Sequence, residues 1–361
     1  MRNEFPTGTG QRRKLMNNMT DLIKDSCKFN AAIIGCGAIH ALHADTLIKS
    51  PLAVLSSVVD IDPARAKASS KKYSCNFFTD YNKVLEDENI DVIHICTPHY
   101  LHADMAIAAM EHRKHVILEK PMAIKLPDAE KLIYTSAATG KQLGICFQNR
   151  YNTSSVKAKS FLTSGKGGNI LGARAFVTWY RDEEYYTGSG WRGTWEREGG
   201  GVLINQSIHT LDLLHWFMGD IHRIKGSVDT RALKKVIEVE DTAEAAIQFK
   251  SGATALFYAT NCYCANAPVM IEIVTENAVL KIEDGLTIKY NNGESESYSD
   301  VDKSTGAKAY WGSSHKTLID DFYSRLAEGN KFPLDGSEGI KALKMLHAIY
   351  SSNKSGKYVA L

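Results

Sequence analysis

Short apolar runs alternate with helix-length amphipathic segments from Phe29 to Gln148. Apolar runs of this length, separated by helical patterns, are typical of buried parallel strands. The predicted strands are Ala31–Ile34, Val54–Val59, Val92–Ile95, Val116–Leu118 and Leu143–Phe147. The predicted helices are His40–Lys49, Pro63–Tyr73, Tyr81–Asp87, His102–Glu111 and Pro127–Thr139. The alternation predicts an α/β fold with a doubly wound parallel sheet of the Rossmann type.

Beyond Arg150 the segments become longer, and apolar and polar residues alternate with a period of two. This pattern predicts the strands Ala173–Tyr180, Thr242–Phe249, Ala253–Ala259, Met270–Thr275 and Ala278–Glu283. Turn signals at Lys250-Ser251-Gly252 and Glu276-Asn277 favour antiparallel pairing. Helices predicted to cover one face are Ser154–Thr163, Gly201–Met218, His315–Glu328 and Ser337–Ser352. The second half is therefore predicted to be an α+β domain with a large, mostly antiparallel open sheet, which suits a homodimer or homotetramer.

The charged residues are almost balanced, with 43 Lys and Arg against 41 Asp and Glu and a net charge of +2. This balance argues against nucleic acid or a membrane as partner and favours a small molecule. The seven cysteines include no C-x-x-C pair, which argues against a disulfide framework and a zinc site, so we expect no metal centre. A reducing, cytoplasmic location fits this pattern best.

The 361 residues are enough for two domains, which we place at 29–150 and 151–361. Residues 1–28 are polar and lack the apolar core of a secretory signal. We expect a disordered extension there, or a misplaced start with Met16 or Met19 as the initiator, and the intact mass of natively expressed protein distinguishes the two. No other segment approaches the ~18 apolar residues of a membrane span.

The segment Gly35-Cys36-Gly37-Ala38-Ile39-His40 follows a predicted strand and opens a predicted helix, the context of a dinucleotide-binding turn. Gly35, Gly37, Ala38 and Ile39 are candidates for contact with a pyrophosphate at the helix N-terminus. His40 replaces the third glycine of the motif. A glycine turn that serves packing alone is the alternative.

Asp60, 25 residues after Gly35, ends the second predicted strand, where a carboxylate can accept hydrogen bonds from the adenosine ribose. A carboxylate repels a 2′-phosphate, so NAD is favoured over NADP. The alternative is that Asp60 or Asp62 only caps the next helix. Thr97 and Pro98 follow another strand and are expected near the nicotinamide half of the cofactor, with a plain strand-to-helix loop as the alternative.

Glu119 and Lys120 directly follow the strand Val116–Leu118, at the edge where open α/β sheets bind ligands, and so join the predicted cofactor site. Helical periodicity also places Asn205 and His209 on one polar stripe of a predicted helix. Alcohol oxidation by a nicotinamide needs a base and a group that stabilises charge on the oxygen. Lys120 and His209 can supply both, with Asn205 orienting His209 or binding a substrate hydroxyl. A solvated lysine and an ordinary helix histidine are the alternatives.

Together these motifs resemble the glucose–fructose oxidoreductase, inositol dehydrogenase and rhizopine-catabolism (Gfo/Idh/MocA) family, over about residues 30–361. The resemblance is carried by Gly35-Cys36-Gly37, Val59-Asp60-Ile61-Asp62-Pro63, Thr97-Pro98 with His102, Glu119-Lys120-Pro121, the glycine-led helix ending in His209, and Asp321-Phe322-Tyr323. It implies that Lys120 contacts the nicotinamide ribose and positions the substrate oxygen. It also implies that His209 is the acid/base and that a cis peptide bond precedes Pro121.

Members of the family commonly have aspartate where this chain has Asn205. A neutral partner stabilises a protonated imidazole less well, so we expect a lower pKa for His209. Asn205→Asp is then expected to shift the pH–rate profile to higher pH, and an unchanged profile would remove Asn205 from the site.

Substrate contacts are expected from a stretch rich in aromatic residues and arginine, residues 179–195. Aromatic rings stack on the C–H faces of sugars, and polar groups bind the hydroxyls. The candidates are Arg150, Tyr186, Trp191, Arg192 and His315. An oligomer interface built from exposed aromatic residues is the alternative for this stretch.

The sequence thus predicts a cytoplasmic, NAD-dependent oxidoreductase that oxidises a secondary hydroxyl of a cyclic polyol or sugar, or reduces the matching ketone. Two alternatives from the resemblance stay open. One is a sugar-converting enzyme with tightly bound, internally recycled NAD. The other is a non-catalytic nucleotide-binding regulator, which a pulldown would test and which the presence of both Lys120 and His209 disfavours.

Overall fold

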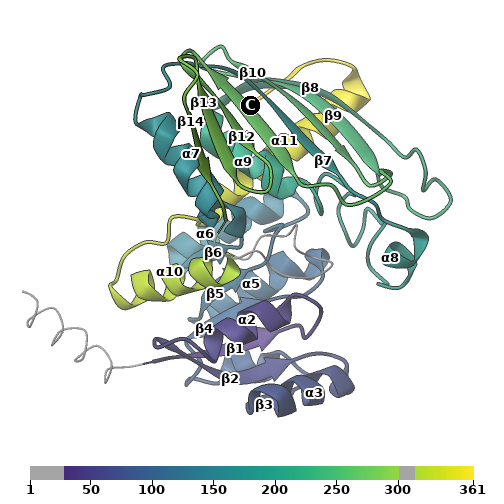
Figure 1. Ribbon diagram of the computed structural model, residues 1–361. Helices are drawn as coiled ribbons and strands as arrows, with labels where there is room; N and C mark the ends of the chain where they lie inside the picture. The colour runs from purple at the N-terminus through teal and green to yellow at the C-terminus, as the bar shows by residue number, and fades with distance from the viewer. Residues whose placement is uncertain (1–27, 301–313) are drawn as a thin grey trace, which may run out of the picture.

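The computed structural model describes residues 28–300 and 314–361, which form two sheets with flanking helices (Figure 1). The predicted N-terminal extension, apart from Lys28, and the alternative initiators Met16 and Met19 lie outside the described residues. None of the helices within the described ranges is long and apolar enough to cross a bilayer.

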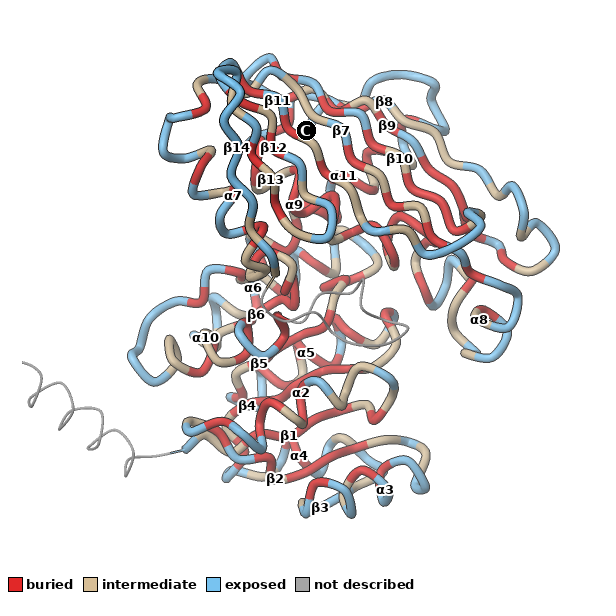
Figure 2. Tube along the Cα trace, in the orientation of Figure 1, coloured by how far each residue is buried: buried red, intermediate tan, exposed pale blue. Residues whose placement is uncertain are grey.

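The first sheet has six parallel strands in the order β3-β2-β1-β4-β5-β6, which is doubly wound. Its strands are β1 (Phe29–Ile34), β2 (Ala53–Val59), β3 (Asn76–Phe78), β4 (Val92–Ile95), β5 (His115–Leu118) and β6 (Leu143–Ile145). Its helices are α2 (His40–Leu47), α3 (Pro63–Tyr73), α4 (Asn82–Glu86), α5 (His102–Glu111) and α6 (Leu126–Thr139). The central strands β1, β4 and β5 are buried over most of their length (Figure 2). The predicted Rossmann sheet is confirmed, and only the short edge strand β3 is missing from the prediction.

The second sheet has nine strands in the order β14-β13-β12-β11-β7-β10-β9-β8-β15. They are β7 (Ile170–Thr178), β8 (Ile221–Asp229), β9 (Thr242–Phe249), β10 (Thr254–Thr260), β11 (Met270–Thr275), β12 (Ala278–Ile282), β13 (Leu286–Tyr290), β14 (Ser295–Tyr298) and β15 (Val359–Ala360). All neighbouring strands in this order are antiparallel except β7 and β10, which are parallel. The mostly antiparallel sheet predicted from the alternation is therefore confirmed as a mixed sheet.

Helices α7 (Thr153–Thr163), α9 (Ile208–Met218) and α11 (Gly336–Ser355) pack on the second sheet, against β12 to β14, β7 and β8 respectively. Helix α10 (His315–Ala327) packs instead against α2 beside the first sheet (Figure 1). The prediction that this segment covers the second sheet is therefore wrong. The chain thus returns from the second sheet to the first at α10, which places His315 at the carboxyl edge of the first sheet.

The predicted helix over Gly201–Met218 is also wrong at its start, because residues 201–207 form turns and α9 begins at Ile208. The cause is a buried carboxylate. Oε1 of Glu240, a residue that is 2% exposed, accepts hydrogen bonds from the backbone N–H of Gly201 at 2.9 Å and of Leu203 at 3.0 Å. A Cβ at position 201 would lie 1.8 Å from the Glu240 carbonyl oxygen, so glycine is required there. Helical periodicity gives no sign of this long-range contact.

Candidate active site

The turn from Gly35 to Ile39 connects the carboxyl end of β1 to α2. Gly35 has a φ of +97°, and a Cβ there would lie 2.7 Å from the Cys96 carbonyl oxygen. Position 37 is open instead, because no heavy atom of the described residues lies within 4 Å of where its Cβ would be. The turn therefore combines a tight bend with backbone that a pyrophosphate can approach, which fits NAD.

His40, which stands in place of the third glycine, ties this turn to α3. Its Nδ1 lies 2.6 Å from the Gly37 carbonyl oxygen, and its Nε2 lies 3.2 Å from Ser69 Oγ. The substitution thus keeps the turn fixed by hydrogen bonds rather than by close packing of a glycine.

Asp60 supports the same turn from the end of β2. Its Oδ2 accepts a hydrogen bond from Cys36 N at 2.8 Å, and its Oδ1 accepts one from Asp62 N at 2.9 Å. Asp62, not Asp60, caps α3, since its Oδ1 accepts from Ala64 N at 2.9 Å. Asp60 remains at the wall of the cavity described next.

One cavity of about 470 Å³ connects the turn with the catalytic candidates. The predicted residues that line it are Gly35, Gly37, Ala38, Ile39, Asp60, Thr97, Pro98, Glu119, Lys120, Trp191, Arg192, Asn205, His209 and His315. Thr97 Oγ1 and His315 Nδ1 are buried polar atoms that find no partner within the described part of the chain. Such atoms in a cavity wall are suited to hydrogen bonds with a ligand.

Lys120 projects from the end of β5, after a cis peptide bond to Pro121 as the resemblance implies. Its Nζ donates hydrogen bonds to the Asn205 carbonyl oxygen at 2.7 Å and to Asn205 Oδ1 at 3.3 Å. Desolvation lowers the pKa of Lys120 to about 8, against the opposing effect of Glu119 and Glu198. The ammonium is therefore mostly protonated at neutral pH and can exchange a proton slightly above it.

A carboxylate that the sequence analysis missed, Glu198, is fully buried behind Asn205. Its Oε1 accepts a hydrogen bond from Asn205 Nδ2 at 2.6 Å, and its Oε2 accepts one from Gly193 N at 2.5 Å. Burial raises the pKa of Glu198 to about 7. The Asn205 amide thus lies between Lys120 and Glu198. In the sequence, the role of Glu198 is marked only by its position next to a glycine run.

His209 lies in the first turn of α9 and lines the cavity. The prediction that Asn205 orients it is wrong, because Asn205 precedes the helix and its amide bonds Lys120 and Glu198. Nδ1 of His209 is buried without a partner among the described residues, and the ring packs edge-on against Phe147. Desolvation and the Lys120 ammonium hold the pKa of His209 well below its usual 6.5. The imidazole is therefore neutral and able to accept a proton.

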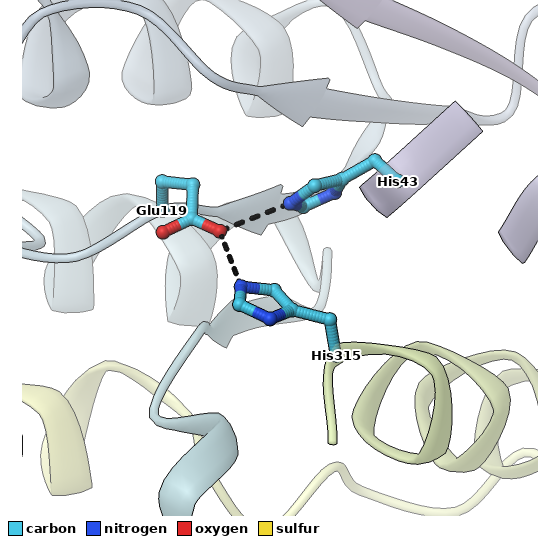
Figure 3. A group of neighbouring side chains, drawn as sticks. All are labelled: His43, Glu119 and His315. Atoms are coloured by element: carbon cyan, nitrogen blue, oxygen red, sulfur yellow. Dashed lines mark hydrogen bonds and ion pairs between the residues drawn. The ribbon is translucent and has the colours of Figure 1, made fainter. Parts of the chain in front are cut away.

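Glu119 anchors a chain of buried imidazoles (Figure 3). Its Oε1 lies 3.0 Å from His43 Nε2 and 3.1 Å from His315 Nε2. The chain continues from His43 Nδ1 to His94 Nδ1 and from His94 Nε2 to the Tyr323 hydroxyl, each over 2.8 Å. Burial raises the pKa of Glu119, but the bonds to His315 and His43 outweigh it and hold that pKa well below its usual range.

An ionised Glu119 fixes the proton positions along this chain. It accepts Nε2–H from His43 and from His315, so His43 Nδ1 accepts from His94, and His94 Nε2 accepts the Tyr323 hydroxyl proton. One ring nitrogen of His43, one of His315 and a carboxylate oxygen of Glu119 lie close enough together to be considered as metal ligands. Hydrogen bonds pair these atoms in the structure, and the expectation of no metal centre stays a prediction.

Two predicted substrate residues, Arg150 and Tyr186, do not line the cavity. Arg150 is 6% exposed and forms ion pairs with Asp212 at 2.6 Å and with Glu338 at 3.0 Å. Tyr186 is 2% exposed, and its hydroxyl accepts a hydrogen bond from Asn261 Nδ2 at 2.8 Å. Both side chains are buried with their polar groups engaged inside the protein, so we assign them structural roles and withdraw the substrate prediction.

Two family descriptions match most of the chain. Residues 29–147 match "Oxidoreductase family, NAD-binding Rossmann fold", and residues 155–281 match "GFO/IDH/MocA C-terminal domain". The first match contains the glycine turn, Asp60, Glu119 and Lys120, and the second contains Asn205 and His209.

Individual relatives are distant. The chain is 23% identical over 354 residues to the D-apiose dehydrogenase of Rhizobium rhizogenes, covering 95% of this chain and 98% of the relative. It is 28% identical over 197 residues to the inositol 2-dehydrogenase of Salmonella typhimurium, covering 54% of this chain and about half, 55%, of that relative. The crystal structure of the WlbA dehydrogenase from Bordetella pertussis in complex with NADH and UDP-GlcNAcA matches with a TM-score of 0.80 at 27% identity, covering 92% of this chain and 99% of that one.

Proposed function

Since the chain belongs to the Gfo/Idh/MocA family of oxidoreductases, we propose that it is an NAD-dependent dehydrogenase of a cyclic polyol or sugar. It would oxidise a secondary hydroxyl or reduce the matching ketone. The observation that carries the proposal is that Lys120 and His209 line the same cavity as Gly35 and Gly37. The names of the D-apiose and inositol dehydrogenases support the substrate class.

Bound NAD would supply the hydride acceptor. The Lys120 ammonium would donate a hydrogen bond to the substrate oxygen and stabilise the negative charge that develops there. His209, neutral because its pKa is depressed, would take the hydroxyl proton. In the reverse direction the same two groups would polarise the ketone and return the proton.

We propose that NAD is preferred over NADP. The Asp60 carboxylate lines the cavity at the end of β2, and the nearby Arg65 has its Nε 3.4 Å from Asp62 Oδ2. A 2′-phosphate bound at the end of β2 would lie beside the Asp60 carboxylate, whose two oxygens already accept hydrogen bonds from backbone N–H groups. The two negative charges would repel each other. Affinities for NADH and NADPH, measured by fluorescence titration, test this preference.

The test of the activity is NADH formation from excess NAD with a panel of inositols, aldoses and anhydro-sugars. Sustained NADH formation by the wild type is expected, with loss of at least about a hundredfold in Lys120→Met and His209→Asn because each removes a group used in the transition state. His215→Asn is the matched control, since His215 is on the same helix but outside the cavity. No NADH from any substrate, with NAD co-purifying, would refute the proposal and favour internally recycled NAD or a regulator.

We also propose a homodimer or homotetramer that associates through the open face of the second sheet. Leu171 on β7 and Leu256 on β10 are 56% and 59% exposed, on neighbouring strands, and Val274 on the adjacent β11 is 37% exposed. Light scattering after gel filtration should give a dimer or tetramer for the wild type and a smaller species for Leu256→Glu. A cytoplasmic location remains a prediction from the cysteine pattern.

A further inference from the structure

We propose that the substrate carries a carboxylate, which Arg192 binds while Lys120 holds the reacting oxygen. This inference rests on the proposed dehydrogenase function and narrows its substrate class from sugars and polyols in general to sugar acids. It starts from the surroundings of one side chain in the cavity wall.

The Arg192 guanidinium is held in place by two aromatic side chains, with no carboxylate of the described residues in ion-pair contact. Its carbon lies 4.4 Å from the centroid of the Tyr185 ring and 4.9 Å from that of Trp191. Its Nη1 reaches the Tyr185 carbonyl oxygen only at 3.5 Å, and its Nε is buried without a partner among the described residues. Within residues 28–300 and 314–361 it forms no ion pair. A guanidinium that packs on aromatic rings keeps its N–H donors free for a planar anion.

Arg192 belongs to the reacting end of the cavity, not to the adenosine end. The Tyr185 hydroxyl, on the ring that Arg192 covers, accepts a hydrogen bond from Asn205 Nδ2 at 3.4 Å. The carbonyl oxygen and Oδ1 of the same Asn205 accept hydrogen bonds from the Lys120 ammonium. Arg192 is also close enough to contribute to the lowered pKa of Lys120. One small ligand can therefore contact both cations, whereas the pyrophosphate is expected at the Gly35 turn.

The end of the cavity near Lys120 and Arg192 has an excess of positive charge, which favours an anionic ligand. Lys120 and Arg192 line the cavity, and Glu119, the carboxylate that lines it beside Lys120, is already bonded to two imidazoles. Glu198 is behind the wall and bonded to Asn205 and Gly193. A neutral sugar would bury the Arg192 donors without an anionic acceptor, which costs binding energy, while a carboxylate can accept two of them.

The experiment measures binding to the NADH complex by calorimetry, with acids and their amides as pairs of equal shape. The probes are D-glucuronate with D-glucuronamide, D-galacturonate with D-galacturonamide, and D-gluconate with D-gluconamide. We expect at least one acid to bind at least about tenfold more tightly than its amide. Arg192→Gln should abolish that preference, and Arg192→Lys should keep part of it, because the charge remains but the planar fork is lost.

Arg197→Gln is the matched control. Arg197 is in the same loop, is exposed and does not line the cavity, although it donates a hydrogen bond to the carbonyl oxygen of Gly190, which does. Its loss should therefore leave the preference for acids unchanged. NADH affinity should be unchanged in both Gln variants, which shows that they fold and that Arg192 does not bind the cofactor.

Four outcomes would each overturn the proposal. Two concern the wild type: acids and amides bind equally, or no acid binds. The other two concern Arg192→Gln: the preference for acids survives, or NADH affinity is lost. The failure of the dehydrogenase function looks different. If acids bind through Arg192 but no NADH forms, the activity is wrong and the anion site stands. If neutral polyols are oxidised but acids bind no more tightly than their amides, the dehydrogenase proposal stands and the anion site is refuted.

Discussion

Replacing Glu198 with glutamine tests whether the buried carboxylate behind Asn205 sets the charge state of Lys120. Hydrogen bonds of 3.3 Å to Lys120 Nζ and 2.6 Å to Glu198 Oε1, on either side of the Asn205 amide, keep the two charges within about 8 Å. At that separation and an effective dielectric constant of about 20, they attract by about 2 kcal/mol, or between about one and two pKa units. Glu198, with a pKa of about 7, is only partly ionised at neutral pH, so the expected drop in the pKa of Lys120 is about one unit from about 8.

The assay is the pH dependence of kcat/KM at saturating NAD, which reports the free enzyme. In the proposed mechanism protonated Lys120 is the active form, so activity should fall as pH rises through its pKa. Glu198→Gln should then move this alkaline limb to lower pH by about one unit. Glu240→Gln is the control, because Glu240 is also buried with a pKa of about 7 but bonds Gly201 and Leu203 instead of Asn205. A limb that stays in place in Glu198→Gln, or that moves equally in the control, would refute the reasoning.

Three further predictions test other parts of the structure. Gly35→Ala, strained by its φ of +97°, should lower both the melting temperature and NADH affinity, whereas Gly37→Ala should lower NADH affinity alone; calorimetry and fluorescence titration compare them. Asn205→Asp should move the alkaline limb of the pH–rate profile to higher pH, because an added carboxylate stabilises the active-site ammonium; an unchanged limb would count against this. Arg150→Met should lower the free energy of unfolding by about 3 to 5 kcal/mol by leaving Asp212 buried and unpaired, and urea unfolding of Arg150→Met/Asp212→Leu should recover most of it.

The local parts of the site could be predicted from the sequence because strand ends and turns are local properties. The apolar run before Glu119 and Lys120 is β5, and parallel strands end at one edge, so these residues had to face the cofactor turn. The turn at Gly35 follows the same logic.

The parts that failed depend on contacts between distant residues. The helix predicted from Gly201 is stopped by Glu240, which is 39 residues away. Arg150 closely follows the predicted strand Leu143–Phe147, yet its guanidinium is bonded to Asp212, 62 residues away. Glu198 has no periodic signal at all, since its role comes from burial against Gly193 and Asn205. Long-range hydrogen bonds of buried charges are not encoded in local patterns, and they decide which charged residues remain available to a ligand.

The same balance of charges links the two proposals through Lys120. Arg192 lowers the pKa of this lysine, while Glu119 and Glu198 raise it. A carboxylate bound to Arg192 would offset the first effect, so the pKa of Lys120 would be higher in the substrate complex than in the free enzyme. Because kcat reports the complex and kcat/KM the free enzyme, the alkaline limb of kcat should then lie at higher pH than that of kcat/KM for an acidic substrate. A neutral substrate further desolvates the ammonium and brings no anion, so its two limbs should be ordered the other way. The order of the two limbs therefore shows, from rates alone, whether an anion lies beside Lys120 during turnover.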